Sequence, residues 1–453
     1  MSRHPSFTSS ALNTWVTSVV VGFISLANVL IVSRVLGATG RGDFAFMSAV
    51  AYLSSQLALL GVEQANINFA SAKPELRRAL ATNSLLLSLL LGGIAAGLVA
   101  GGIALIPRVG GPAPVDLRWL MLAAIPMLVL QVYMLLLVRA DYAFGLANVA
   151  TLITPVLNIV ANGALAAGGR LTVGTAYGAW VAGQALGTLL MVWHVARRSA
   201  GFGRPDLGLA RRSLGFGLKA QGGRAMTLGN YRLDQWIVGG ISGARALGLY
   251  SVAVAWSETL FYLPTALASV QRPDLVRMER GDAAREAATA FRATMVITVP
   301  MMIVLVVGAP FFCATVFGAE FRGSTNELRI LSLGAVGVAA LKLFGNALTA
   351  QRKPMLETAA VSAAFVVTVA LDILLIPPHA GLGASFASTV AYSAGGIAAV
   401  VLFARALGAR TSDLIPRPRD AGVLWREARA LIRRGGEPNE REAIAPRLDR
   451  FER

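Results

Sequence analysis

Charged and amide side chains inside an apolar stretch are the first candidates for chemistry in this sequence. The run N-Y-R-L-D-Q-W-I-V-G-G, residues 230–240, contains Arg232, Asp234 and Gln235, and Arg224 lies two helical turns before it. Guanidinium groups pair with anions and stay charged, and a carboxylate among apolar residues is suited to carry a proton or a cation. These residue types favour anion binding and ion coupling.

The stretch has the length and flanks of a membrane-spanning helix, where a central arginine costs at least ~3 kcal/mol. At ~100° per residue, the polar residues from Arg224 to Gln235 fall within one arc, and Leu233 and Ile237 lie opposite. The polar arc must therefore face protein or water, and the apolar arc must face lipid or packed neighbours.

Three other apolar runs show a polar face of the same kind. Asn28 lies on this face in the run near 11–33, Gln56 and Glu63 in the run near 44–66, and Glu258 and Tyr262 in the run near 247–270. Four such faces that converge predict a wide hydrophilic cavity.

Each of these residues also has a structural interpretation. Polar stripes often mark helix–helix contacts, and Arg224 with Glu258 would make a buried ion pair. Lys342 is a further candidate for the cavity, whereas Asp372, close to Pro377, is expected at the membrane interface.

The elements that carry these residues are expected to be helices that cross a membrane. The chain of 453 residues is 55% hydrophobic and only 14% charged, with a mean hydropathy of +0.62. Lipid offers backbone groups no hydrogen-bonding partners, so continuous apolar runs of ~20 residues must be helical. About twelve such runs occur, near 11–33, 44–66, 79–106, 117–138, 145–167, 172–196, 214–240, 247–270, 288–312, 326–349, 355–376 and 382–404.

The net charge of +17 is concentrated in alternate loops, which argues for a membrane orientation and against a nucleic-acid partner. Counted from a cytoplasmic N-terminus, the odd-numbered loops hold one or two arginines each. By the positive-inside rule, both termini are expected in the cytoplasm. The even-numbered loops hold Lys73, Arg77, Arg78, Arg197, Arg198, Arg204, Arg211, Arg212, Lys219, Arg272, Arg277, Arg280, Arg285 and Arg292.

No residue pattern favours an enzyme, a metal site or a cofactor. The single cysteine, Cys313, is expected to pack in the core, and three histidines are scattered near the ends of runs. The turns G-A-T-G-R-G (37–42) and G-A-R-A-L-G (243–248) lack the preceding strand and the following Lys-Ser/Thr of a phosphate loop. They are interpreted as tight turns between adjacent helices.

Two segments of the first half recur in the second. Residues 30–44 match 236–250 at an offset of 206, and residues 117–124 match 328–335 at an offset of 211. Six expected helices separate the copies, which predicts two six-helix bundles in a parallel pseudo-twofold repeat. The expected divisions are a bundle at 1–200, a linker at 201–213, a bundle at 214–405 and a cytoplasmic Arg-rich tail at 406–453. A duplicated channel or a membrane enzyme would be the alternatives to a transporter.

Three motifs resemble those of the Wzx-type polysaccharide flippases. They are R-V-L-G-A-T-G-R-G-D-F, then Y-R-L-D-Q-W-I-V-G-G, then V-F-G-A-E-F-R-G-S-T-N-E-L-R-I-L at 316–331. The wider group includes multidrug/toxin exporters and lipid II flippases, and the resemblance covers about residues 10 to 405. It departs from the lipid II flippases in having about twelve expected helices, no basic face on the first helix and an additional tail.

The resemblance implies an all-α polytopic protein of a bacterial inner membrane, with a V-shaped central cavity and alternating access. The implied substrate is a polyprenyl-pyrophosphate-linked glycan that moves from the inner to the outer leaflet. The implied partners are membrane lipids and a polysaccharide polymerase or glycosyltransferases. Arg224 and Arg232 would meet the pyrophosphate. Tyr231, Gln235, Gln56 and Tyr262 would contact sugars. Asn28 and Lys342 are further expected cavity residues, from their places in the apolar runs rather than from the resemblance.

Glu258, Asp234 and Glu63 lie on the polar faces and are the expected carriers of a coupling ion or proton. Two other functions stay open. One is a multidrug/toxin cation exporter of the same fold, and the other is a non-transporting scaffold whose tail recruits glycosyltransferases or anionic lipid.

Overall fold

The described part of the chain is built from helices. A computed structural model describes residues 7–199, 201–409 and 414. Its α-helices are α1 (Phe7–Ala58), α2 (Val62–Ala72), α3 (Arg77–Leu105), α4 (Arg118–Ala140), α5 (Phe144–Ala167), α6 (Val173–Arg198), α7 (Leu207–Ser257), α8 (Tyr262–Arg277), α9 (Arg280–Pro310), α10 (Ser324–Leu333), α11 (Ala335–Ala350) and α12 (Pro354–Leu407). Shorter helical turns join them, namely η1 (Pro74–Leu76), η2 (Pro107–Gly110), η3 (Val115–Leu117), η4 (Glu258–Phe261), η5 (Phe311–Phe317) and η6 (Ala319–Gly323).

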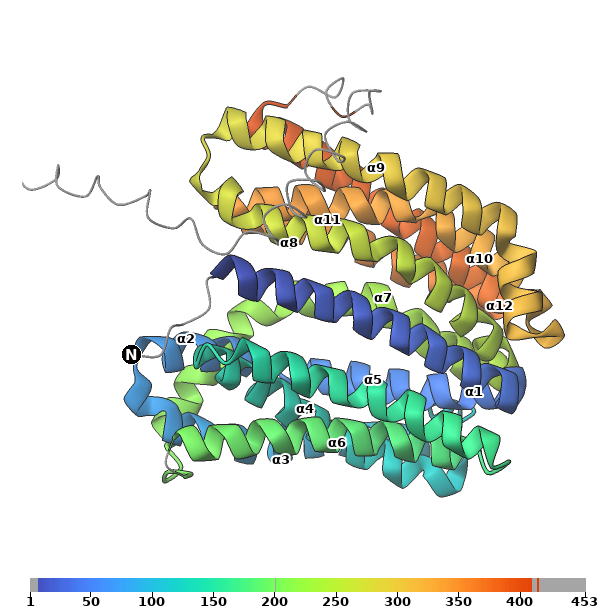
Figure 1. The fold of residues 1–453 in the computed structure, drawn as a ribbon, viewed down its shortest axis with the longest axis horizontal. Coiled ribbons are helices and arrows are strands. Elements are labelled where there is room, and N and C mark those ends of the chain that lie inside the picture. Colours follow the sequence, from blue (N-terminus) through green and yellow to red (C-terminus); the bar gives the residue numbers. More distant parts are fainter. Residues whose placement is uncertain (1–6, 200, 410–413, 415–453) are drawn as a thin grey trace, which may run out of the picture.

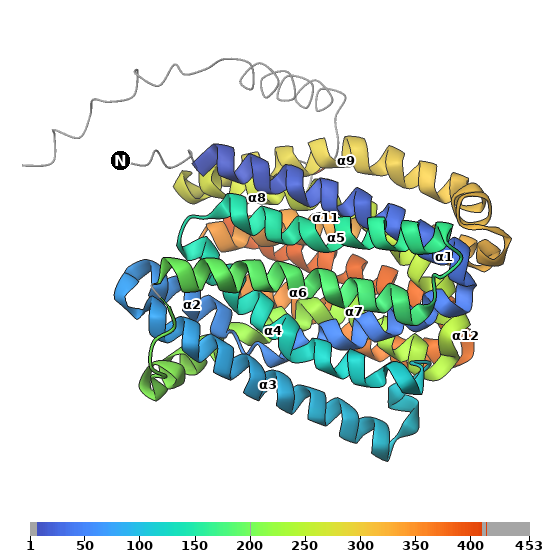
Figure 2. The same ribbon diagram turned by 60° about the horizontal axis from the view of Figure 1, so that its bottom comes forward.

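The helices form two halves. In Figure 1, α2 to α6 lie below, α8 to α12 lie above, and α1 and α7 run between them. α1 packs chiefly on α7, and α7 also packs on α12. The turned view in Figure 2 shows the long helices side by side with similar directions, as expected for helices that share one membrane.

The described residues contain nine helical segments that are long and apolar enough to cross a membrane. Large apolar side chains such as Leu98, Val307 and Ile397 are exposed on them, and lipid is the natural partner of such side chains. The prediction of a multi-pass all-α protein is therefore confirmed.

Three of the nine segments contain a non-helical residue where the helix direction breaks. These residues are Gly37 in α1 (φ 66°), Gly243 in α7 (φ 84°) and Ala380 in α12 (φ 50°). Figure 1 shows α1 turning back at the end where its label stands. The glycine-rich motifs are turns between adjacent helices, as expected, but the count of about twelve crossings stays a prediction.

The turns at Gly37 and Gly243 meet through reciprocal contacts. A Cβ on Gly42 would lie 1.8 Å from the carbonyl oxygen of Ala244, and one on Gly248 would lie 1.8 Å from that of Ala38. Ala38 pairs with Ala244, and Gly42 with Gly248, in the sequence repeat at offset 206. Equivalent residues therefore make equivalent contacts here, as around a local twofold axis; the repeat of whole bundles stays a prediction.

The start of α7 packs on the first half. Leu209 belongs to a buried cluster with Met134 and Met191, and a Cβ on Gly217 would lie 2.4 Å from the carbonyl oxygen of Leu60. α7 thus begins against the first half and continues into the second. The expected boundary at 213/214 stays a prediction, and most of the tail at 406–453 lies outside the described residues.

Candidate functional site

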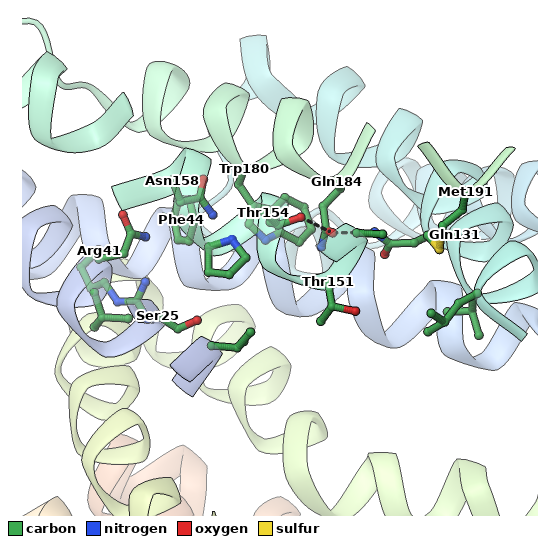
Figure 3. Close-up of a pocket in the computed structure, with 17 residues that line it drawn as sticks. Ser25, Arg41, Phe44, Gln131, Thr151, Thr154, Asn158, Trp180, Gln184 and Met191 are labelled. Carbon is green, nitrogen blue, oxygen red and sulfur yellow. Dashed lines mark hydrogen bonds between the residues drawn. The ribbon is translucent and has the colours of Figure 1, made fainter. Parts of the chain in front are cut away.

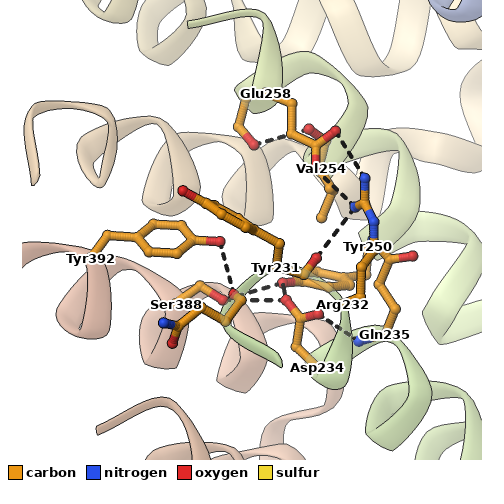
Figure 4. Close-up of polar contacts among 11 residues, drawn as sticks. Tyr231, Arg232, Asp234, Gln235, Tyr250, Val254, Glu258, Ser388 and Tyr392 are labelled. Atoms are coloured by element: carbon orange, nitrogen blue, oxygen red, sulfur yellow. Dashed lines mark hydrogen bonds and ion pairs between the residues drawn. The ribbon is translucent and has the colours of Figure 1, made fainter. Parts of the chain in front are cut away.

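Arg232 and Glu258 form an ion pair on the second half, from α7 and from η4 (Figure 4). Arg232 Nη1 lies 2.8 Å from Glu258 Oε1, and Nη2 lies 3.4 Å from Oε2. Their side chains are 29% and 27% exposed. The expected structural pair with Glu258 is therefore made by Arg232; the side chain of Arg224 lies outside the described residues.

Asp234 points away from this pair into a polar cluster between α7 and α12 (Figure 4). Its Oδ1 accepts a hydrogen bond from the backbone N–H of Gln235 at 2.7 Å, and its Oδ2 accepts from the Tyr250 hydroxyl and from Ser388 Oγ at 3.3 Å. Asp234 and Gln235 are both buried. Three donors thus hold one carboxylate in the interior of the second half.

Asp372, on α12, is wholly buried within the protein, and its expected position at the membrane interface stays a prediction. The kink at Ala380 lies beyond Pro377 and Pro378, so Asp372 sits inside the helix rather than at its end. Within the described residues, neither of its carboxylate oxygens has a hydrogen-bonding partner. It is close enough to Asp234 for the two carboxyl groups to interact electrostatically. A buried carboxyl group of this kind is stable when it holds a proton or a cation.

Lys342 lies over an aromatic ring that itself belongs to a group of three rings. Lys342 Nζ, on α11, lies 5.6 Å from the centre of the Tyr231 ring. Tyr231 also contacts Phe261 and Tyr392, with ring centres 6.3 and 5.7 Å apart. The Tyr262 ring packs directly on Gly22 of α1, which joins the two halves.

Arg41, on α1 directly before Gly42, is a functional candidate that the sequence analysis missed. It is 8% exposed, its Nε donates to Ser251 Oγ at 3.1 Å, and its guanidinium lies 5.6 Å from the centre of the Phe44 ring. No carboxylate of the described residues forms a salt bridge with it, and it lies within electrostatic range of Arg232. The missed signal is an arginine inside a turn whose second copy carries Leu247 instead.

A pocket of about 430 Å³ opens inside the first half, next to Arg41. It lies between α1, α4, α5 and α6, and Figure 3 shows Arg41 and Met191 at its opposite ends. Gln131 Nε2 and Thr154 Oγ1 both donate to Gln184 Oε1, at 2.8 and 3.0 Å. The polar and aromatic lining comprises Ser25, Asn28, Arg41, Phe44, Gln131, Thr151, Thr154, Asn158, Trp180 and Gln184.

Of the expected cavity residues whose side chains the structure describes, only Asn28 lines this pocket. Its Oδ1 accepts from Asn162 Nδ2 at 2.8 Å. Gln56 and Glu63 are buried further along the chain, where Gln221 Nε2 donates to the Gln56 carbonyl at 3.0 Å. The convergence of the four expected polar faces in one cavity stays a prediction.

A family model described as "polysaccharide biosynthesis protein" matches residues 31–326, which is more than half of the chain. The chain belongs to this family. No curated protein sequence matches it.

Solved structures with a similar fold are membrane transporters. The chain is similar to the lipid II flippase MurJ in an inward closed conformation, with a TM-score of 0.73, 12% identity, and coverage of 94% of this chain and 93% of that one. It is also similar to an inward-facing multidrug transporter of the MATE family and MOP superfamily, with a TM-score of 0.64, 15% identity, and coverage of 87% and 98%. A MOP superfamily transporter from Pyrococcus furiosus, whose description notes a binding pocket of reverse polarity, gives a TM-score of 0.57, 17% identity, and coverage of 87% and 92%.

These comparisons confirm the resemblance found in the sequence motifs. The fold is that of the MOP-type flippases and transporters, and the family is one of polysaccharide biosynthesis. The protein is thus a membrane protein of this polysaccharide biosynthesis family, and the solved structures that share its fold are described as a flippase and as transporters.

Proposed function

We propose that the protein moves a polyprenyl-diphosphate-linked glycan from the inner to the outer leaflet of a bacterial inner membrane by alternating access. In this proposal the two halves are six-helix bundles with the boundaries expected from the sequence, giving twelve crossings. Both termini lie in the cytoplasm, where the basic loops meet anionic lipid.

The observation that carries the proposal is the pair Arg41 and Arg232. They come from α1 and α7 and lie within electrostatic range of one another; Arg41 is buried, and the Arg232 side chain is 29% exposed. Arg232 is already paired with Glu258, so Arg41 supplies the uncompensated charge. A diphosphate offers oxygens on both sides, and a guanidinium group binds such oxygens in pairs. Arg224 would extend this basic surface along α7.

The charge of the site argues against export of an organic cation. A cation needs a carboxylate or an aromatic cage to replace its hydration, whereas Arg41 repels it. Similarity to multidrug transporters at 15% identity supports the fold alone. A glycan with a charged diphosphate fits the residues better.

Coupling to an ion gradient belongs to the same proposal, with Asp234, Glu258 and Glu63 as the original candidates. Asp234 is the strongest of them because Asp372, a second buried carboxyl group, lies within electrostatic range of it. Two carboxyl groups in one buried space share a proton or a cation more readily than each holds its own charge. Glu258 is engaged with Arg232 and would change partner only when that pair opens.

Transport in vesicles tests the proposal directly. Purified protein would be reconstituted with a fluorescent polyprenyl diphosphate that carries one sugar, and a membrane-impermeant quencher would report the leaflet. The wild type should exchange the lipid between leaflets, and Arg41→Ala should slow the exchange about ten- to hundredfold, the loss of a charged hydrogen bond. Arg245→Ala, an exposed arginine on α7, is the matched control. Exchange no faster than in empty vesicles would contradict the proposal.

A scaffold function predicts a different outcome. If the Arg-rich tail recruits a polymerase or glycosyltransferases and no lipid is moved, removal of residues 410–453 abolishes glycan assembly in cells. The flippase function predicts that vesicle transport survives this truncation and fails in Arg41→Ala.

A further inference from the structure

The pocket of the first half carries amide and hydroxyl groups that the diphosphate does not need. Its volume of about 430 Å³ lies within the ~300–1,000 Å³ range of small-ligand sites. We propose that this pocket binds uncharged sugar residues of the glycan, beside a diphosphate held at Arg41 and Arg232. The proposal rests on the proposed function and specifies the substrate class of that site.

Two amides in the pocket are partly satisfied by each other. Gln131 Nε2 and Thr154 Oγ1 converge on Gln184 Oε1, which fixes the positions of all three side chains. Within the described residues, Gln131 Oε1 and Gln184 Nε2 have no hydrogen-bonding partner. An acceptor and a donor therefore remain on two side chains that are hydrogen-bonded to each other, and sugar hydroxyls are both donors and acceptors.

Asn158 independently indicates that a hydrogen-bond donor from a ligand belongs in the pocket. It is 6% exposed and lines the pocket, yet its Oδ1 has no partner among the described residues. Leaving a buried carbonyl oxygen unpaired is unfavourable, so a ligand hydroxyl that donates to it would gain affinity. Trp180, whose ring centre lies 5.2 Å from that of Tyr177, adds an aromatic wall against which a sugar ring can pack.

The charges of the lining select between ligand classes. Among the described residues that line the pocket, Arg41 is the one ionised side chain, and no carboxylate is present. Figure 3 places Arg41 at one end, with Thr154, Gln184 and Gln131 following toward Met191. A ligand with an anionic group at one end and uncharged hydroxyls beyond it matches this order.

Binding measurements with two lipids separate the sugar from the diphosphate. The probes are a polyprenyl diphosphate and the same lipid carrying one uncharged hexose, titrated against the full chain in lipid nanodiscs. Gln184→Ala and Asn158→Ala should each weaken binding of the glycosylated lipid roughly five- to tenfold and leave binding of the sugar-free lipid unchanged. Arg41→Ala should weaken binding of both lipids.

Thr188→Ala is the matched control, because Thr188 is buried one turn from Gln184 and donates only to that residue's carbonyl. It should change neither affinity. The sugar site would be overturned if Gln184→Ala and Asn158→Ala both bound the glycosylated lipid as tightly as the wild type does. It would also be overturned if they lost the same affinity for both lipids. If the wild type bound neither lipid, the proposed function itself would be contradicted. If it bound both lipids with equal affinity, only the sugar site would be contradicted.

Discussion

At the scale of residues, the two buried aspartates differ in their hydrogen bonding. Asp234 is held by Tyr250, Ser388 and the backbone of Gln235, whereas Asp372 has no hydrogen-bonding partner among the described residues. A carboxylate that accepts hydrogen bonds at both oxygens loses those at one of them when it becomes an amide, because the NH2 group cannot accept. A carboxyl group without partners has nothing to lose, and its neutral isostere avoids the cost of burying charge.

We therefore expect opposite effects of the two amide substitutions on stability. Asp234→Asn should lower the thermal unfolding temperature, and Asp372→Asn should leave it unchanged or raise it. Both should abolish any dependence of transport on an ion gradient. Thermal unfolding of the purified variants and vesicle transport with and without a gradient are the measurements. A larger loss of stability in Asp372→Asn would contradict this account.

The pair Arg232 and Glu258 leads to a prediction about coupling between residues. Removing one partner leaves the other charge unpaired, so Arg232→Met and Glu258→Gln should each destabilise the protein. The double variant should lose less stability than the sum of the losses of the two single variants. The difference should be about 1–3 kcal/mol for a fully buried pair and smaller here, because both side chains are partly exposed. A double-mutant cycle on thermal unfolding measures this, and strict additivity would show that the pair contributes nothing.

At the scale of elements, the turns inside α1 and α7 decide how closely the two halves approach one another. Gly42 and Gly248 bring the turns of α1 and α7 into backbone contact. A side chain at either position would collide with the carbonyl group of the opposite turn. The repeat at offset 206 was visible in the sequence because glycine and alanine recur at the same steps. That the two copies touch each other was not visible, since a repeat indicates similar local folds and not their mutual position.

Gly42→Ala should disrupt this contact, because the new Cβ would lie 1.8 Å from the carbonyl oxygen of Ala244. The expected result is a loss of several kcal/mol, seen as a lower unfolding temperature and yield. Gly97→Ala in α3 is the control, with no atom within 4 Å of its Cβ, and should be stabilising by up to ~1 kcal/mol. Equal behaviour of the two variants would contradict the close packing.

At the scale of the whole molecule, the two halves are joined at the end where α1 turns back. Arg34 donates to the carbonyls of Val316 and Thr315 at 2.7 and 2.9 Å, and the Ala38 N–H donates to Glu320 Oε2 at 3.0 Å. Trp236 Nε1 also donates to the carbonyl of Val109 at 3.2 Å. These contacts close the end opposite the basic loops, which is the outer end in the proposed orientation.

The closed outer end predicts one-sided access to the pocket. With Cys313 replaced by Ala, a cysteine at Ser25, which lines the pocket, should react with an impermeant thiol reagent from the cytoplasmic side only. Adding Arg34→Ala and Glu320→Gln should increase labelling from the outer side. Inside-out and right-side-out vesicles allow the comparison. Equal labelling from both sides in the parent variant would rule out the closed end.

The sequence alone determined the class of the protein, because apolar runs of membrane length leave the backbone no alternative to helices. It also revealed the family motifs and the glycine turns, which are local patterns. Which polar residues share one space depended on tertiary structure: Arg232 pairs with Glu258, and Arg41 lies beside a pocket whose amides come from α1, α4, α5 and α6. Helical periodicity gives the face of each helix, but only packing decides which neighbour that face meets.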